Sequence, residues 1–244
     1  MQIIQSTSTS PTFNLATEEY LFTECQEEIL FFYVNEPSVI IGCNQGIQNE
    51  VNLDYCRENN IQVVRLMFGG GSVYYDLENL NYSFISNKTK ENSSLNPDFL
   101  NPIVEVLKIM GIPVEIGKRK DLWLPGGFKI SGTASHVGKK RELHHGTLLY
   151  DTNLELLQKS LDVKNKNIKI KGITSVPSKV KNIKTHLESK NINAPTSNEF
   201  IEICLREFCK YYQTDFRLLN ENEIAETEAL TVKKYRSEEW TFKK

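Results

Sequence analysis

The stretch Arg65-Leu-Met-Phe-Gly-Gly-Gly-Ser-Val-Tyr-Tyr-Asp76 governs the interpretation of the whole chain. The β-branched run 61–64 before it predicts a buried strand, and the aromatic-rich, alternating run 73–85 after it predicts the partner strand. A loop of three glycines between them can adopt positive φ and bring backbone N–H groups against a ligand. The competing interpretation is a flexible hairpin turn. Neither a P-loop nor a dinucleotide fingerprint fits, because no Gly-Lys-Ser/Thr and no spaced glycines follow.

Size and composition narrow the class of protein. A chain of 244 residues suits one large domain or two small ones with a real core. The formal net charge of −2 argues against a general nucleic-acid binder, whose affinity depends on many phosphate-neutralising cations. Five scattered cysteines fit reduced thiols better than a disulfide framework. With no signal peptide and no apolar run of membrane-spanning length, we expect a cytoplasmic protein that makes no contact with a membrane.

Hydrophobic periodicity and capping residues predict alternating strands and helices. Asn14 is the predicted N-cap of the first helix, the polar run 87–97 a loop, and the lysine-rich run 163–186 a surface segment. Several links are too short for parallel crossovers, which predicts an α+β fold of mixed α/β character, with mixed, largely antiparallel sheets flanked by helices. Further strands are expected at 2–6, 29–35, 38–42, 113–116, 122–124, 128–131 and 147–151, and helices at 15–26, 51–60, 102–110, 154–161, 198–212 and 221–230.

A second group of candidate residues lies between positions 118 and 147. Lys129 is flanked by Phe128 and Ile130, and strand alternation directs its side chain to the opposite face. It is either a solvated lysine or a cation that holds an anion in a cleft. Only one of His144 and His145 can face a given side of a strand. With four histidines in all and no carboxylate at metal spacing, a zinc site is excluded.

Seven short sequence blocks follow one another along the chain. They are Phe13-Asn-Leu-Ala-Thr-Glu-Glu-Tyr20, Ile41-Gly42 with Asn44-Gln45, the triple glycine running into Val73-Tyr74, Lys129-Ile-Ser-Gly132, His144-His-Gly-Thr-Leu-Leu149, Lys171-Gly-Ile-Thr-Ser-Val176 and Glu239-Trp240. In order and spacing these blocks resemble the catalytic domain of the lipoate–protein ligase A family, whose fold is shared with biotin–protein ligases. The resemblance implies a single catalytic domain over residues 1–244, without the accessory C-terminal domain of many ligases.

The resemblance implies ATP-dependent attachment of lipoate to a lysine of lipoyl domains through lipoyl-AMP. Lys129 would be the catalytic residue, offsetting the repulsion between the lipoate carboxylate and the α-phosphate of ATP. Asp121 would help to place Mg²⁺ or the phosphates, without a direct protein cluster for the metal. The residues implied to bind ATP or lipoyl-AMP are Arg65, Gly70, Gly71, Ser72, Val73, Tyr74, Asp121, Lys129, His145 and Thr147.

The resemblance also implies the partners. These are lipoate or lipoyl-AMP, the lipoyl domains of the glycine cleavage H protein and of 2-oxoacid dehydrogenase E2 subunits, and a separate polypeptide carrying the accessory domain. The lysines of the run 164–184 are a candidate contact for acidic lipoyl domains, and a merely solvated surface is the alternative.

The chain departs from the family pattern at six positions. At position 66 the chain has leucine where the family usually has arginine, and it therefore lacks the charged guanidinium with its five N–H donors. Two alternatives therefore stay open. One is a lipoyl or octanoyl transferase that takes an activated or protein-bound acyl group, with Cys43 as its candidate cysteine. The other is a non-catalytic binder of lipoate or lipoyl domains. This chain has Leu66, Cys43 and Pro177 where the family has arginines. It has Phe68 where the family has a serine, Tyr75 where it has a histidine and Lys120 where it has an asparagine.

Overall fold

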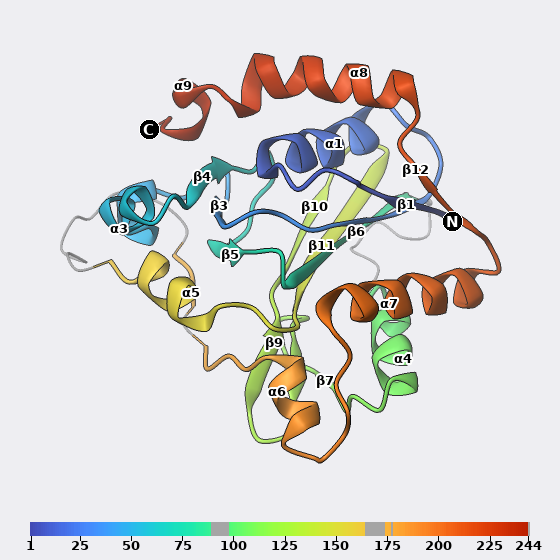
Figure 1. Ribbon diagram of the computed structural model, residues 1–244. Coiled ribbons are helices and arrows are strands. Elements are labelled where there is room, and N and C mark those ends of the chain that lie inside the picture. The colour runs from blue at the N-terminus through green and yellow to red at the C-terminus, as the bar shows by residue number, and fades with distance from the viewer. Residues whose placement is uncertain (89–97, 164–173, 177, 244) are drawn as a thin grey trace.

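The computed structural model describes residues 1–88, 98–163, 174–176 and 178–243 (Figure 1). Its described strands form one six-stranded sheet, β10-β11-β6-β2-β1-β12, and two three-stranded sheets, β4-β3-β5 and β7-β8-β9. The strands are β1 (Gln2–Gln5), β2 (Ile29–Tyr33), β3 (Ser38–Ile41), β4 (Gln62–Arg65), β5 (Val73–Tyr75), β6 (Asn79–Asn87), β7 (Glu115–Ile116), β8 (Leu122–Leu124), β9 (Phe128–Ser131), β10 (Thr133–Val137), β11 (Arg141–Leu149) and β12 (Phe216–Leu218).

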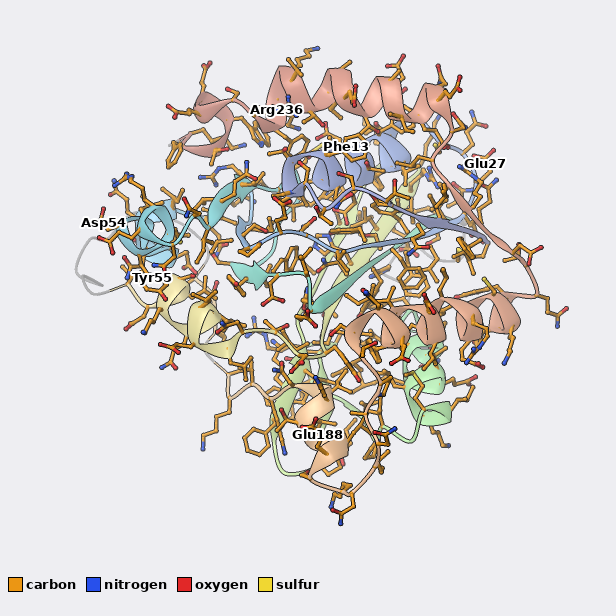
Figure 2. The ribbon with its side chains drawn as sticks, viewed as in Figure 1. Phe13, Glu27, Asp54, Tyr55, Glu188 and Arg236 are labelled. Carbon is orange, nitrogen blue, oxygen red and sulfur yellow. The ribbon has the colours of Figure 1, made fainter. Side chains whose placement is uncertain are left out.

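Helices cover both faces of the large sheet (Figure 1). α1 and α8 form one layer, whereas α4 and α7 pack on the other side. Phe13 of α1 and Arg236, which follows η1, lie in the first layer (Figure 2). The helices are α1 (Pro11–Thr23), α2 (Ile47–Glu50), α3 (Leu53–Glu58), α4 (Asn101–Ile109), α5 (Leu154–Leu161), α6 (Ile183–Glu188), α7 (Ser197–Tyr212), α8 (Glu221–Leu230), the π-helical η1 (Thr231–Tyr235) and α9 (Glu238–Thr241).

The two faces of the large sheet contribute to two hydrophobic clusters. Neighbouring residues of a strand point to opposite faces, so Ile3 joins the cluster with α4 and α7 while Ile4 joins the cluster with α1. Every residue of β2 is buried, as expected for a strand covered on both sides. The predicted mixed α and β architecture is therefore confirmed. None of the helices in the described ranges is both long and apolar enough to cross a membrane.

The predicted pairing of the two strands around the triple glycine is wrong. β3 lies between β4 and β5, parallel to the former and antiparallel to the latter. The predicted strand 73–85 is two strands in different sheets, because Asp76 ends β5: its carboxylate accepts hydrogen bonds from the N–H groups of Glu78 at 3.1 Å and Asn153 at 2.8 Å. The glycines therefore connect two non-adjacent strands and do not form a hairpin turn.

The N-cap prediction for the first helix is also wrong. α1 begins at Pro11, whose missing N–H and fixed φ suit a first helical position. Ser10 is the cap, and its Oγ accepts from the N–H of Phe13. Asn14 is fully buried one turn into the helix, where its amide donates to the carbonyls of Ser8 at 2.8 Å and Val34 at 3.0 Å.

The lysine-rich run is only partly a surface segment. Residues 164–173 and 177 lie outside the described residues, as does most of the predicted loop 87–97. Within the described part, α6 buries Ile183 and Leu187 against the core because they lie one turn apart on one face. Strand β10 was not predicted, and β11 begins six residues before the predicted strand. Helices α5, α7 and α8 lie where predicted, α7 beginning one residue early.

Candidate functional site

Lys129 of β9 is the cation around which the candidate site is built. Its Nζ lies 3.1 Å from Oδ2 of Asp121, and its side chain is 20% exposed. Burial raises the pKa of Asp121, but hydrogen bonds from Trp123 and Lys129, together with the charge of Lys129, outweigh burial and lower that pKa below its usual value. Asp121 is therefore ionised near neutral pH, and the interpretation of Lys129 as a freely solvated lysine is excluded.

A pocket of about 390 Å³ opens beside this ion pair. Lys118 and Arg119 add positive charge to its lining, and Trp123 and Ile116 add apolar surface. A pocket that combines cations with an aromatic wall suits a ligand with both a phosphate and a ring. The full lining is Glu115, Ile116, Gly117, Lys118, Arg119, Asp121, Trp123, Leu124, Gly126 and Gly127.

The glycine loop lies tightly against neighbouring backbone. Gly70 has a φ of 142°, in the region that favours glycine. A Cβ at Gly42 would lie 2.2 Å from the Gly70 carbonyl oxygen, and a Cβ at Gly70 would lie 3.0 Å from Cβ of Ala134. Glycine at both positions thus permits close backbone contact between the end of β3, the loop and β10.

A small polar network fixes the loop at Ser72. The Ser72 N–H donates to Oγ of Ser175 at 2.8 Å, and the Ser72 hydroxyl donates to Oε1 of Gln45 at 2.9 Å. Gln45 Nε2 donates to Ser175 Oγ at 3.1 Å, and the Ser175 N–H donates to Oε2 of Glu50 at 3.2 Å. Three blocks that are far apart in sequence therefore meet at one loop. An oxygen atom already accepts from a loop amide, so this position suits an anionic oxygen.

The segment that carries Ser175 continues alongside Lys129. The Lys129 N–H donates to the carbonyl of Lys179 at 2.8 Å, and the Lys181 N–H donates to the carbonyl of Lys129 at 3.2 Å. After β9, the Gly132 N–H donates to Oγ1 of Thr147 at 3.2 Å, and a Cβ at Gly132 would lie 3.7 Å from Val73. Lys129 is thus bonded through its backbone to the segment 179–181, and Gly132 at the end of β9 lies close to Val73, the first residue of β5.

Arg65 is engaged within the protein. It is 1% exposed, and its guanidinium donates to the carbonyls of Gly42 at 3.0 Å, Gln45 at 2.9 Å and Thr241 at 2.9 Å. Burial lowers the pKa of this guanidinium. The structure therefore gives Arg65 the role of joining the loop after β3 to the C-terminal α9.

Of the other predicted site residues, Tyr74 and His145 lie apart from the ion pair. Tyr74 is buried in a cluster with residues of β3, α2 and α3. Nδ1 of His145 lies 3.1 Å from the fully buried carboxylate of Glu18. His144 points to the opposite face, where its ring stacks on Phe99 at 4.0 Å and burial lowers its pKa to about 4. The predicted alternation of the two histidines is confirmed.

The departures from the family pattern mostly face the core. Leu66 and Phe68 are buried in the cluster that includes α1, and the Phe68 ring lies 4.7 Å from that of His136. Tyr75 is buried in the same cluster. Cys43 is partly exposed as a free thiol, and its N–H donates to the Phe68 carbonyl at 2.8 Å. Leu66, Phe68 and Tyr75 therefore add apolar side chains to the core on either side of the glycine loop in sequence.

Two residues of the pocket carried no sequence signal. Gly117 and Trp123 both touch the Asp121 carboxylate, and Trp123 lies opposite Lys129 in the ladder between β8 and β9. Neither belongs to a motif; the turn after β7 brings Gly117 to Asp121, and the pairing of β8 with β9 places Trp123 opposite Lys129. Among the described residues, no group of three or more His, Cys, Asp or Glu side chains is arranged to hold a metal ion.

The family model for the lipoyl protein ligase A/B catalytic domain matches residues 10–209. Lipoate-protein ligase LplJ of Bacillus subtilis is 36% identical over 239 residues, covering 95% of this chain and 70% of that protein. Lipoate–protein ligase 1 of Staphylococcus aureus is 38% identical over 237 residues, covering 96% and 70%. The human mitochondrial lipoyl amidotransferase LIPT1 is 36% identical over 230 residues, covering 92% and 60%.

Solved structures resemble the fold along nearly its whole length. A crystal structure of lipoate-protein ligase A bound with ATP superposes with a TM-score of 0.79 at 27% identity, covering 99% of this chain and 98% of that one. A bipartite lipoate protein ligase from Thermoplasma acidophilum, studied with its E2 lipoyl domain, has a TM-score of 0.79 at 28% identity, covering 99% and 96%. The chain therefore belongs to the lipoate–protein ligase family and carries its catalytic domain.

Proposed function

We propose that this ligase joins lipoate to a lysine of a lipoyl domain in two steps, through lipoyl-AMP. The observation that carries the proposal is the largely buried Lys129–Asp121 ion pair at a pocket lined by the cations Lys118 and Arg119. The relative bound to ATP and the relatives named as lipoate ligases support ATP and lipoate as the substrates. Residues 1–244 would act as one catalytic domain.

The first step brings two anions together. A lipoate carboxylate oxygen attacks the α-phosphorus of ATP, the bond to the bridging oxygen breaks, and pyrophosphate leaves. In the proposed complex Lys129, which the structure pairs with Asp121, would lie between the two anions, and its charge would offset their repulsion. Lys118 and Arg119 of the pocket lining supply further positive charge for the phosphates.

The glycine loop would hold the reacting oxygens. In the proposed complex a substrate oxygen replaces Ser175 Oγ as the acceptor of the Ser72 N–H, with Gly70 and Gly71 close beside it. Val73 and Thr147 position this loop through Gly132. Of the other predicted binding residues, Arg65 and Tyr74 support the loop from inside the protein, and His145 lies with Glu18.

Asp121 also suits the Mg²⁺ that accompanies ATP. Magnesium commonly binds one or two carboxylates and takes its remaining ligands from phosphates and water, so a larger protein cluster is not required. Bound with ATP, the ion would neutralise part of the phosphate charge.

The second step transfers the acyl group. The amine of the acceptor lysine attacks the acyl carbon of lipoyl-AMP, AMP leaves with the bonding electrons, and the amine loses a proton. A preorganised cation beside the departing phosphate lowers the barrier by stabilising the charge that develops there. The E2 lipoyl domain that accompanies the bipartite relative supports a lipoyl domain as the acceptor.

Exchange of pyrophosphate into ATP in the presence of lipoate tests the first step. Lys129→Ala should reduce this exchange by about 10²–10³, equivalent to about 3 kcal/mol, while leaving the circular dichroism spectrum unchanged. Lys210→Ala is the matched control, since Lys210 is 64% exposed on α7 and pairs with Glu207. Equal exchange by Lys129→Ala and the wild-type protein would contradict the proposed role of Lys129.

The similarity to a lipoyl amidotransferase supports a second candidate, acyl transfer without adenylate formation. Three measurements separate the candidates: AMP formation from lipoate and ATP, acyl transfer from synthetic lipoyl-AMP, and transfer from a lipoylated protein. A transferase would fail the first test and pass one of the others, and a non-catalytic binder would fail all three while binding lipoate. Cys43→Ser would abolish protein-to-protein transfer only if the thiol carries the acyl group.

A further inference from the structure

Trp123 shares one sheet face with Lys129. The two residues are directly opposed in the antiparallel ladder between β8 and β9, and opposed side chains have Cβ atoms roughly 4.5–5.5 Å apart. The ladder shifts register between Leu122 and Trp123. Such β-bulges turn a side chain to a new direction and recur next to active sites. Trp123 is therefore a direct neighbour of the proposed catalytic cation.

The side chain of Trp123 also holds the partner of that cation. Its indole N–H lies beside the Asp121 carboxylate, both next to Gly117, and a hydrogen bond from Trp123 contributes to the lowered pKa of Asp121. The indole N–H is the only donor that a tryptophan side chain possesses. Oδ2 of the same carboxylate lies 3.1 Å from Nζ of Lys129. Asp121 is thus held from two sides, and its side chain is only 7% exposed.

Gly117 makes room for this arrangement. A Cβ at Gly117 would lie 2.3 Å from Oδ1 of Asp121 and 2.5 Å from Nε1 of Trp123. The Gly117 N–H donates to the Asp121 carbonyl at 2.8 Å, which closes the turn between β7 and β8. Only a hydrogen atom fits between the carboxylate, the indole and this turn, so the contact depends on glycine at position 117.

We infer that Trp123 is a positioning residue of the adenylate-forming site: its indole N–H orients Asp121, Asp121 holds the Lys129 ammonium, and the ring forms a wall of the nucleotide pocket. The inference rests on the proposed function for the identity of the ligand. A single contact to Lys129 would leave the carboxylate free to rotate. Because displacement of a reacting group by about 1 Å can cost 10²-fold in rate, fixing the carboxylate has a direct chemical consequence.

Trp123→Phe tests the inference, since it keeps an aromatic ring and removes the N–H. We expect kcat of pyrophosphate exchange to fall roughly ten- to a hundredfold, as for a lost hydrogen bond to a charged group, with KM for lipoate unchanged. Gly117→Ala displaces the same contact, so it should likewise lower kcat and leave KM for lipoate unchanged. Wild-type kcat in Trp123→Phe would overturn the positioning role. An equal loss of kcat/KM that arises entirely from a higher KM for lipoate would overturn it as well.

The contact can be tested without any catalytic assay. In a double-mutant cycle of Trp123→Phe and Asp121→Asn, we expect the shift in urea midpoint of the double variant to be smaller than the sum of the single shifts. Additive shifts would overturn the contact. The double-mutant cycle tests the contact even if the wild-type protein forms no adenylate. Absence of adenylate formation in the wild-type protein would count against the proposed function instead.

The wall of the pocket has its own spectroscopic readout. The sequence contains two tryptophans, so in a Trp240→Phe background the tryptophan emission comes from Trp123 alone. Addition of ATP should change this emission along a curve that matches calorimetric binding. Calorimetric saturation with unchanged emission would overturn the placement of the ring against the nucleotide.

Discussion

Replacement of Arg65 by methionine tests whether this arginine supports the fold or contacts a ligand. Methionine keeps much of the apolar volume and removes the donors that hold the carbonyls of Gly42, Gln45 and Thr241, at 2.9–3.0 Å. A hydrogen bond to a charged group contributes about 1.5–3 kcal/mol. Three such contacts released together are not additive, because the freed carbonyls regain water as the C-terminal segment loosens. We expect unfolding free energy to fall by roughly 3–5 kcal/mol.

Equilibrium unfolding in urea, followed by tryptophan emission, measures this loss. The N–H of the Trp240 indole donates to the Arg65 carbonyl at 2.9 Å, so loosening of α9 should appear as an early change in emission and as faster proteolysis after Ser237. Arg57→Met is the matched control. Arg57 is 79% exposed and pairs with the exposed Asp54, which Figure 2 labels on α3, so its replacement should change stability by no more than about 0.5 kcal/mol.

Two results would refute this reasoning. A loss of less than about 1 kcal/mol in Arg65→Met would mean that the carbonyl contacts contribute little net stability. Unchanged stability together with lost ATP binding would assign the guanidinium to the ligand, as the family resemblance first implied.

Three further predictions concern the glycine loop and the buried histidine. Gly42→Ala should weaken ATP binding at least tenfold by calorimetry, because its Cβ would meet the Gly70 carbonyl at 2.2 Å; wild-type affinity would contradict this close contact. Ser175→Ala should lower KM for ATP, because it frees the Ser72 N–H for a substrate oxygen, and should change the unfolding free energy by no more than about 1 kcal/mol; a raised KM would contradict the proposed replacement of Ser175 Oγ. Burial lowers the pKa of His144 to about 4 in the folded protein, against 6.5 for a histidine in the unfolded chain. Stability should therefore fall by about 3 kcal/mol as pH drops from 6.5 through 4, and His144→Gln should flatten that slope in urea titrations.

Local features of the fold could be predicted because their causes lie within a few residues. The helix α7 follows from its apolar spacing and from the Thr196–Glu199 capping box, which the structure contains. The opposite orientations of His144 and His145 follow from the period of a strand. The N-cap prediction at Asn14 was wrong because Ser10 and Pro11 are a better cap and first residue for the helix. The polar side chain of Asn14 instead forms hydrogen bonds inside the core.

Long-range pairing could not be predicted in the same way. The order of β4, β3 and β5 depends on which of three short strands occupies the centre, and no local period encodes that choice. α6 was hidden because two buried apolar residues within a lysine-rich run give too weak a signal. Its burial depends on the core that α4 and α7 provide from elsewhere in the chain.

The sequence by itself determined the chemistry available to this protein: a lysine on a strand, a loop of three glycines, and seven ordered blocks that identify the family. Tertiary structure decided which groups meet. It directed Arg65 into the protein, brought Ser175 to the Ser72 amide, and paired Trp123 with Lys129 across the β8–β9 ladder. The physical reason is range, since propensity and periodicity act over a few residues, whereas the contacts of Arg65 and Ser175 join segments that are far apart in sequence.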